Sequence, residues 1–246
     1  MKKIAFILLL VMFVSSLASC KRESAVLDES KTYSVSSEIH SLEINLISAN
    51  VLIKHADKIY VESNLKHLEV SESNGVLKIK DNSEDNSKFD DAVFTLYIPA
   101  DIVFENVDIS TGAAKLTADA LSAKSLELKL GAGDVRFKQL NVSSKTDIEG
   151  GTGQISILDG ELTNLTLKMG YGSMNLTASL LGNSDLELGV GQSNITLLGN
   201  RDDYYVKGSG LIYVDGEKIT GDCNIGSGKN KIEILGGIGA INIVFK

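Results

Sequence analysis

Five charged residues recur at nearly constant spacing between positions 108 and 187 and alternate in sign: Asp108, Lys129, Glu149, Lys168 and Glu187. Paired carboxylates that flank a scissile bond are the acid and base of glycoside hydrolysis, so these residues are candidates for catalysis. Here, however, a lysine stands between every two acidic residues. Opposite charges on neighbouring strands stabilise each other. The pattern therefore favours a structural charge ladder, and the sequence predicts no catalytic residue.

Residues with metal-binding or phosphate-binding chemistry are scattered along the chain. His40, His55 and His67 lie in different expected strands and lack the tight spacing of zinc ligands. The acidic stretch 81–91 does not match a calcium-binding loop and is expected to be a solvated loop. The Gly-x-Gly pairs never extend to the GxGxxG of nucleotide-binding loops. We therefore expect neither a metal nor a cofactor.

Tyrosines are the best candidates for a ligand-binding surface. Tyr171, Tyr204 and Tyr213, with Tyr205 next to the second of them, could form an aromatic strip that binds a glycan. An aromatic ring with a polar hydroxyl suits a surface that is partly apolar and partly wet. Packing of these rings against a neighbouring strand is the alternative interpretation.

A repeat of about 19 to 20 residues must position these side chains. One anchor glycine per unit marks it, and successive anchors are 21, 20, 19, 19, 19 and 18 residues apart: Gly112, Gly133, Gly153, Gly172, Gly191, Gly210 and Gly228. Apolar residues alternate on both sides of each anchor, which is typical of strands with one buried face. A regular unit of this size predicts a β-solenoid, a parallel β-helix-like stack of coils.

Equivalent positions of successive units carry similar residues, as stacked coils require. Asn175 and Asn194 share one offset from the anchor, and Thr177 and Thr196 share another. Cys223 falls at an offset that is otherwise apolar, so we expect it to be buried, as free cysteines often are. The outward ladders of such a stack help to fix its register.

The two ends of the chain are less regular. Residues 32–98 alternate as short strands, with a hairpin turn at Asn74-Gly75, and are expected to form an N-terminal β-rich cap and first coil. The repeats then occupy 99–246, and a last strand at 240–245 is expected to close the opposite end of the stack. Such caps matter because open sheet edges invite aggregation.

The N-terminus carries an export signal. Lys2 and Lys3 precede an apolar run that is too short to span a bilayer, and the run ends in Leu17-Ala18-Ser19-Cys20. This order resembles the bacterial lipobox, which implies cleavage after residue 19 and lipidation of Cys20. We therefore expect a signal peptide at 1–19, a lipidated tether at 20–31, and a protein anchored by lipid to the outer face of the plasma membrane or to the outer membrane.

The lipobox, the strand end Tyr97-Ile98-Pro99 and units such as residues 126–135 together resemble a known bacterial group. These are the β-strand-repeat lipoproteins called "putative adhesins", which contain a domain of unknown function. The resemblance covers about residues 40–246 and implies the same all-β fold. It brings no catalytic residues. The unit at 204–207 departs from the pattern, because Tyr205 and Lys207 replace aliphatic residues, and a local shift is expected there.

Three functions follow as hypotheses. The first is a non-enzymatic scaffold or adhesin that binds an envelope or surface component, with a glycan or a protein as its partner. The second is an accessory protein for envelope stress that acts through a membrane partner. The third is a polysaccharide-active β-helix enzyme, although such enzymes need a cleft with convergent functional groups. Nucleic acid is excluded as a partner, because the formal net charge is −8.

Overall fold

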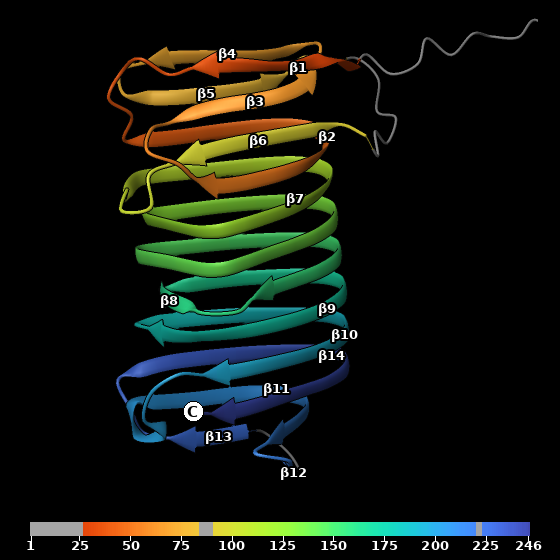
Figure 1. Ribbon diagram of the computed structural model, residues 1–246. Helices are drawn as coiled ribbons and strands as arrows, with labels where there is room; N and C mark the ends of the chain where they lie inside the picture. The colour runs from red at the N-terminus through yellow and green to blue at the C-terminus, as the bar shows by residue number, and fades with distance from the viewer. Residues whose placement is uncertain (1–26, 84–90, 220–222) are drawn as a thin grey trace, which may run out of the picture.

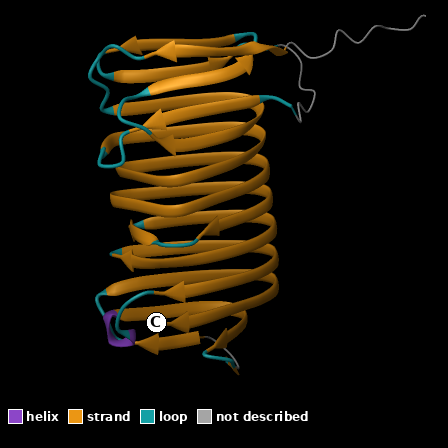
Figure 2. Ribbon diagram, viewed as in Figure 1, coloured by secondary structure: helices purple, strands orange, loops and turns teal. Residues whose placement is uncertain are grey.

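The computed structural model describes residues 27–83, 91–219 and 223–246 (Figure 1). Within these ranges the chain is all-β, apart from the single 3-10 turn η1 at Arg201–Asp203 (Figure 2). The N-terminal strands are β1 (Leu27–Ser34), β2 (Ser41–His55), β3 (Tyr60–Leu65), β4 (Leu68–Ser73), β5 (Val76–Asp81) and β6 (Val93–Ile98). The remaining strands are β7 (Phe104–Ile157), β8 (Gly160–Thr163), β9 (Leu165–Leu181), β10 (Asn183–Leu197), β11 (Tyr204–Val214), β12 (Glu217–Lys218), β13 (Cys223–Gly226) and β14 (Asn230–Phe245).

These strands wind into a stack of coils that share one open sheet (Figure 1). β7 alone is 54 residues long and runs through several consecutive layers of the stack. The pairing of β7 with β9, and of β9 with β10, is parallel, and Asn194 lies opposite Asn175, 19 residues before it. The expected all-β, solenoid-like architecture is therefore confirmed.

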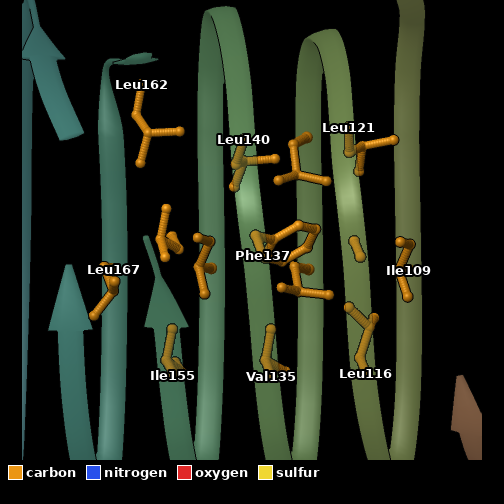
Figure 3. Close-up of a cluster of buried hydrophobic side chains, with 14 of the residues drawn as sticks. Ile109, Leu116, Leu121, Val135, Phe137, Leu140, Ile155, Leu162 and Leu167 are labelled. Carbon is orange, nitrogen blue, oxygen red and sulfur yellow. The ribbon is translucent and has the colours of Figure 1, made fainter. Parts of the chain in front are cut away.

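The core lies inside the coils and consists of one continuous cluster of apolar side chains (Figure 3). Because side chains alternate across a strand and the pairing is parallel and in register, inward residues stack in columns. One such column contains Ile157, Leu176, Ile195, Ile243 and Val214. Full burial of such a side chain is worth roughly 1.5–3 kcal/mol, so each added coil extends the core by several such increments.

The C-terminal strand does not close the stack, contrary to the expectation for residues 240–245. β14 lies between β10 and β11, with parallel pairing on both sides. The far end is instead formed by β11, which pairs antiparallel with β12 and β13. As a result, the units around Gly210 and Gly228 are not consecutive coils, and Gly239 is the glycine that stacks on Gly191. The glycine spacing alone could not detect this exchange of order.

The first anchor of the repeat also needs correction. A Cβ atom placed on Gly131 would meet the carbonyl oxygen of Gly112, and one on Gly133 would meet that of Ala114. Gly112 therefore stacks on Gly131 rather than on Gly133, and Ala114 occupies the place of the turn glycine. The alignment of the first unit was wrong by two residues. Further along, β11 and β14 change register between Ser209 and Leu211, which agrees with the local shift expected near Tyr205 and Lys207.

At the N-terminal end, β2 lies between β7 and a layer made by β5 and β6, all in parallel pairing. The antiparallel strands β4, β3 and β1 complete this end. The hairpin turn at Asn74-Gly75 is confirmed, with φ of 50° and 72° for the two residues. β1 begins at Leu27, so five residues assigned to the tether, 27–31, belong to the sheet. Residues 84–90 of the acidic loop, like the signal peptide and Cys20, lie outside the described residues.

No helix within the described ranges is long and apolar enough to cross a membrane.

Candidate functional site

A groove floored by glycines runs along the outside of the stack, with a volume of about 850 Å³. Its floor is a column of outward positions without side chains: Gly131, Gly151, Gly170, Gly189 and Gly237. A Cβ atom on each would collide with the backbone of the preceding layer. A second column of glycines lies two residues later in each layer. In this column Gly172, for example, has a φ of 138°, a conformation that L side chains rarely adopt. Glycine is thus required by both sterics and conformation.

One wall of the groove is the charge ladder. Lys129, Glu149, Lys168 and Glu187 line it on successive layers. Glu149 lies opposite Lys168, and Lys168 opposite Glu187, where Nζ and Oε2 are 3.6 Å apart. Hydrogen bonding and ion pairing with the half-buried Glu127 raise the pKa of the Lys129 amine. The side chains of the wall therefore alternate in sign from layer to layer.

Asp108 does not belong to this ladder, so the expected alternation holds for four residues rather than five. Asp108 lies opposite Glu43, and the two-residue correction of the first unit places it beside Glu127. Partial burial, Glu127 and Glu43 raise the pKa of its carboxyl, while Lys129 acts in the opposite direction. This neighbouring column contains like charges that repel each other.

The other side of the glycine floor carries an exposed apolar ridge. The residue between the two glycines of each turn is Tyr171, Val190 or Ile238 on three successive layers, and these are directly paired. Tyr171 is 63% exposed and Ile238 is 74% exposed. On the preceding layers the same position is held by Thr152, paired with Tyr171, and by the smaller Ala132 and Ala113. The ridge is thus bulky in one half of the stack and small in the other.

A ladder of amides lies on the strand segment that follows the glycine turn. Asn194 Nδ2 donates to Asn175 Oδ1 at 2.9 Å, and Asn242 Nδ2 donates to Asn194 Oδ1, also at 2.9 Å. Tyr213 on β11 is paired with Asn242 and follows the amides in this column, with Lys218 of β12 on its other side. An amide group can make about four hydrogen bonds, and each ladder contact uses one donor or one acceptor. The column therefore presents hydrogen-bonding capacity to solvent beside an aromatic ring.

The three candidate tyrosines do not form one surface. Tyr204 is buried, and its hydroxyl donates to the carbonyl oxygen of Leu198 at 2.5 Å. Tyr171 stands on the apolar ridge, whereas Tyr213 is half-buried at the end of the amide ladder. Sequence reasoning found Tyr213 and the Asn175–Asn194 pair separately. It missed Asn242, because the position of β14 in the stack is not visible from the spacing.

The other residues considered from the sequence lie apart from these surfaces. His40, His55 and His67 are exposed, and the described residues contain no group of three His, Cys, Asp or Glu residues that could hold a metal ion. Among the described residues, His40 is the one of the three with a carboxylate within 4 Å, its Nδ1 lying 3.9 Å from Glu105 Oε2. Cys223 is fully buried, as expected, and burial raises the pKa of its thiol.

An all-β stack of this kind defines a class of repeat proteins, and comparison with known proteins places the chain within it. Residues 39–197 match the model of the family described as Toastrack DUF4097. The chain belongs to this family, a domain of unknown function, as the resemblance in the sequence implied.

The solved structures that match the chain share little sequence with it. A "putative adhesin" from Bacteroides fragilis is 14% identical with a TM-score of 0.51, covering 87% of this chain and 95% of its own. A "putative cell adhesion protein" from Clostridium sporogenes is 16% identical, with a TM-score of 0.35 and coverage of 89% and 99%. A "putative lipid binding protein" from Parabacteroides distasonis is 13% identical, with a TM-score of 0.40 and coverage of 87% and 96%. No curated protein matches the chain.

Proposed function

We propose that the protein is a non-enzymatic, lipid-anchored β-solenoid of the bacterial cell envelope that acts as an adhesin or scaffold and binds a glycan of the envelope or of another surface. The amide ladder that ends at Tyr213 carries this proposal. The adhesin names borne by proteins of similar fold agree with it.

The ladder suits a polymer of sugars for geometric reasons. Its amides repeat with the layer spacing of about 4.8 Å, so one stretched ligand along the stack would meet the same group repeatedly. Sugar hydroxyls both donate and accept hydrogen bonds, as amides do. The ring of Tyr213 adds an apolar surface with a polar hydroxyl, which is a common combination at binding sites. Repetition of weak contacts would give affinity without a deep pocket.

In a single upright copy, the proposed anchor would present this face away from the membrane. The described chain begins at β1, at one end of the stack, and Tyr213 lies on β11 near the other (Figure 1). With a layer spacing of about 4.8 Å, the two ends are roughly 45 Å apart. A lipid on Cys20 would hold the β1 end at the membrane. In this proposal residues 1–19 are the signal peptide, 20–26 the tether, 27–98 the N-terminal cap and first coil, and 99–246 the repeats.

Binding to an array of envelope glycans and host matrix proteins tests the proposal, with the natural chain and Tyr213→Ala measured side by side. We expect the natural chain to bind at least one glycan and the variant to lose about tenfold or more of that affinity, since one aromatic contact is worth about 1–3 kcal/mol. Tyr205→Ala is the matched control: this tyrosine is also half-buried on β11 but lies opposite Lys231, outside the amide column.

Absence of binding to every glycan would contradict the proposal. So would binding that Tyr213→Ala and Tyr205→Ala reduce equally, because the ligand would then not be held by the amide column.

A further inference from the structure

We propose that two copies of this chain associate through the groove face, defined as the charged wall, the glycine floor and the apolar ridge. The two-fold axis would lie in the interface, along the strand direction, between the layers of Glu149 and Lys168. The two stacks would then be antiparallel. This inference does not use the proposed glycan face, which lies on the strand segment after the glycine turn. It places the β1 ends at opposite ends of the dimer, so two lipid-anchored copies would lie with their stacks along one membrane or would join two membranes.

The charged wall is self-complementary under this operation. Rotation about the axis reverses the order of the layers, so Lys129 of one copy faces Glu187 of the other, and Glu149 faces Lys168. Every charge of the wall therefore meets its opposite. The residues beyond them are uncharged: Ser110 would face Leu235, and Asn45 would face Ser209. An isologous interface requires this kind of self-complementarity.

The apolar ridge is complementary in size under the same axis. Its bulky half, Tyr171, Val190 and Ile238, would lie over the partner's small half, Thr152, Ala132 and Ala113, in that order. Large side chains from both copies would thus fill the space above small ones. The charge pattern and the size pattern are independent observations, and both have their centre between the same two layers.

Exposure of the ridge supports burial by a partner. Ile238 is 74% exposed, Tyr171 is 63% exposed and Leu235, at the end of the charged wall, is 60% exposed. Tyr171 lies on β9, and Leu235 and Ile238 lie on β14, and all three belong to the groove face. A contiguous apolar patch rimmed by charges is typical of a protein interface.

Other arrangements of two copies are disfavoured. Parallel association about an axis along the stack would place charged wall residues over the apolar ridge, which costs desolvation without pairing. End-to-end association through the edge strands, β1 and β4 at one end and β12 and β13 at the other, would leave the charged wall and the exposed ridge uncovered. Within the wall and the ridge, the antiparallel face-to-face dimer is the arrangement in which charge and size both match. The acidic column beside the wall opposes it, because Glu127 would face Asp185.

Charge reversal gives a sharp test, measured by sedimentation of the full chain in mild detergent over a range of protein concentrations. We expect the natural chain to dimerise. Lys129→Glu places like charges at both symmetric contacts of the dimer, and so does Glu187→Lys, so each variant alone should raise the dimer dissociation constant at least tenfold. An equimolar mixture of the two variants should form a heterodimer again, because both contacts then join opposite charges.

The control is Lys138→Glu, another exposed lysine that pairs with the preceding layer, at Asp119, but lies outside the groove face. It should leave dimerisation unchanged, and thermal melting verifies that all variants fold. A natural chain that stays monomeric at all concentrations would overturn the proposal. So would a dimer that neither reversal weakens, or a mixture that shows no rescue. A monomer that binds a linear glycan in the groove would be a further contrary outcome, and Tyr213→Ala separates it from binding at the amide ladder.

Discussion

Gly239 stacks directly on Gly191, although 48 residues separate paired residues of these two strands. The carbonyl oxygen of Gly191 occupies the place that a Cβ atom on Gly239 would take. The chain between them forms β11, η1, β12 and β13, which lie beyond β14 at the end of the stack. The last strand of the sequence is therefore an internal layer of the fold.

Replacement of a turn glycine should be costly for two separable reasons. Gly191 has a φ of 148°, and its Cβ would meet the carbonyl oxygen of Gly172, so Gly191→Ala should destabilise the fold by about 2–4 kcal/mol. Gly216 also has a positive φ, 87°, but has open space around it, so Gly216→Ala should cost only about 1 kcal/mol. Denaturant unfolding of both variants measures the difference. Equal costs would mean that conformation alone, and not the close approach of the layers, selects glycine.

The internal position of β14 predicts a large effect of a substitution close to the C-terminus. Ile243 is buried between Ile195 on β10 and Val214 on β11. Ile243→Ala should cost about 2–5 kcal/mol in unfolding free energy, as expected for a cavity in a packed core. The adjacent Val244, half-buried and outward, is the control and should cost less than about 1 kcal/mol as Val244→Ala. A small effect of Ile243→Ala would instead indicate a frayed terminal strand.

Local patterns predicted most of the central stack, because each coil from β7 to β10 follows its predecessor in sequence. The alternation around Gly153 and Gly172 gives both the strands and their inward faces, and structure and sequence agree there. Sequence failed where stacking order and chain order differ. Nothing local to β14 distinguishes a coil that follows β11 from one inserted before it, since both bury the same alternating face.

The candidate surfaces were harder to predict for the same reason. The alternation of Lys129, Glu149, Lys168 and Glu187 could be found from a constant offset from the anchor glycine. Asp108 was assigned to the same ladder only because the first unit was aligned two residues out of register. Asn242 and Ile238 extend the amide ladder and the apolar ridge only because β14 stacks on β10. Their neighbours in space are far away in sequence, so no periodicity reveals them.

Two carboxyls, Asp108 in the acidic column and Glu105 outside it, should affect stability in opposite ways as the pH changes. Folding raises the pKa of Asp108 through partial burial and through Glu127 and Glu43. Its charged form therefore opposes folding at neutral pH, and this cost disappears as the pH falls through the raised pKa towards the ordinary value of 3.8. Asp108→Asn should be more stable than the natural chain at pH 7, with the advantage shrinking at acid pH in urea unfolding curves.

Glu105 provides the contrasting case. The ion pair with Lys124, with a smaller contribution from His40, lowers the pKa of this carboxyl below 4.5. Its contribution to stability is present above pH 4.5 and is lost as the pH falls through the lowered pKa. Glu105→Gln should therefore be slightly less stable than the natural chain at pH 7 and equal to it at low pH. If both variants shifted stability in the same direction, the electrostatic account of this face would be wrong.

The two cysteines are expected to have different roles, Cys20 in membrane anchoring and Cys223 in core packing. Cys223 is buried with a raised thiol pKa, so it should react with maleimide at least about 100-fold more slowly in the folded chain than after unfolding.

Cys20 is the expected site of lipid attachment. Cys20→Ser should abolish incorporation of labelled fatty acid and release the protein from the membrane fraction, because a lipid supplies the affinity that a short leader cannot. Cys223→Ser is the matched control: it should keep the label and the membrane location, while losing some stability through the hydroxyl placed in an apolar site. Labelling of Cys20→Ser to the natural level would disprove lipidation at this residue and, with it, the orientation in which Tyr213 faces away from the membrane.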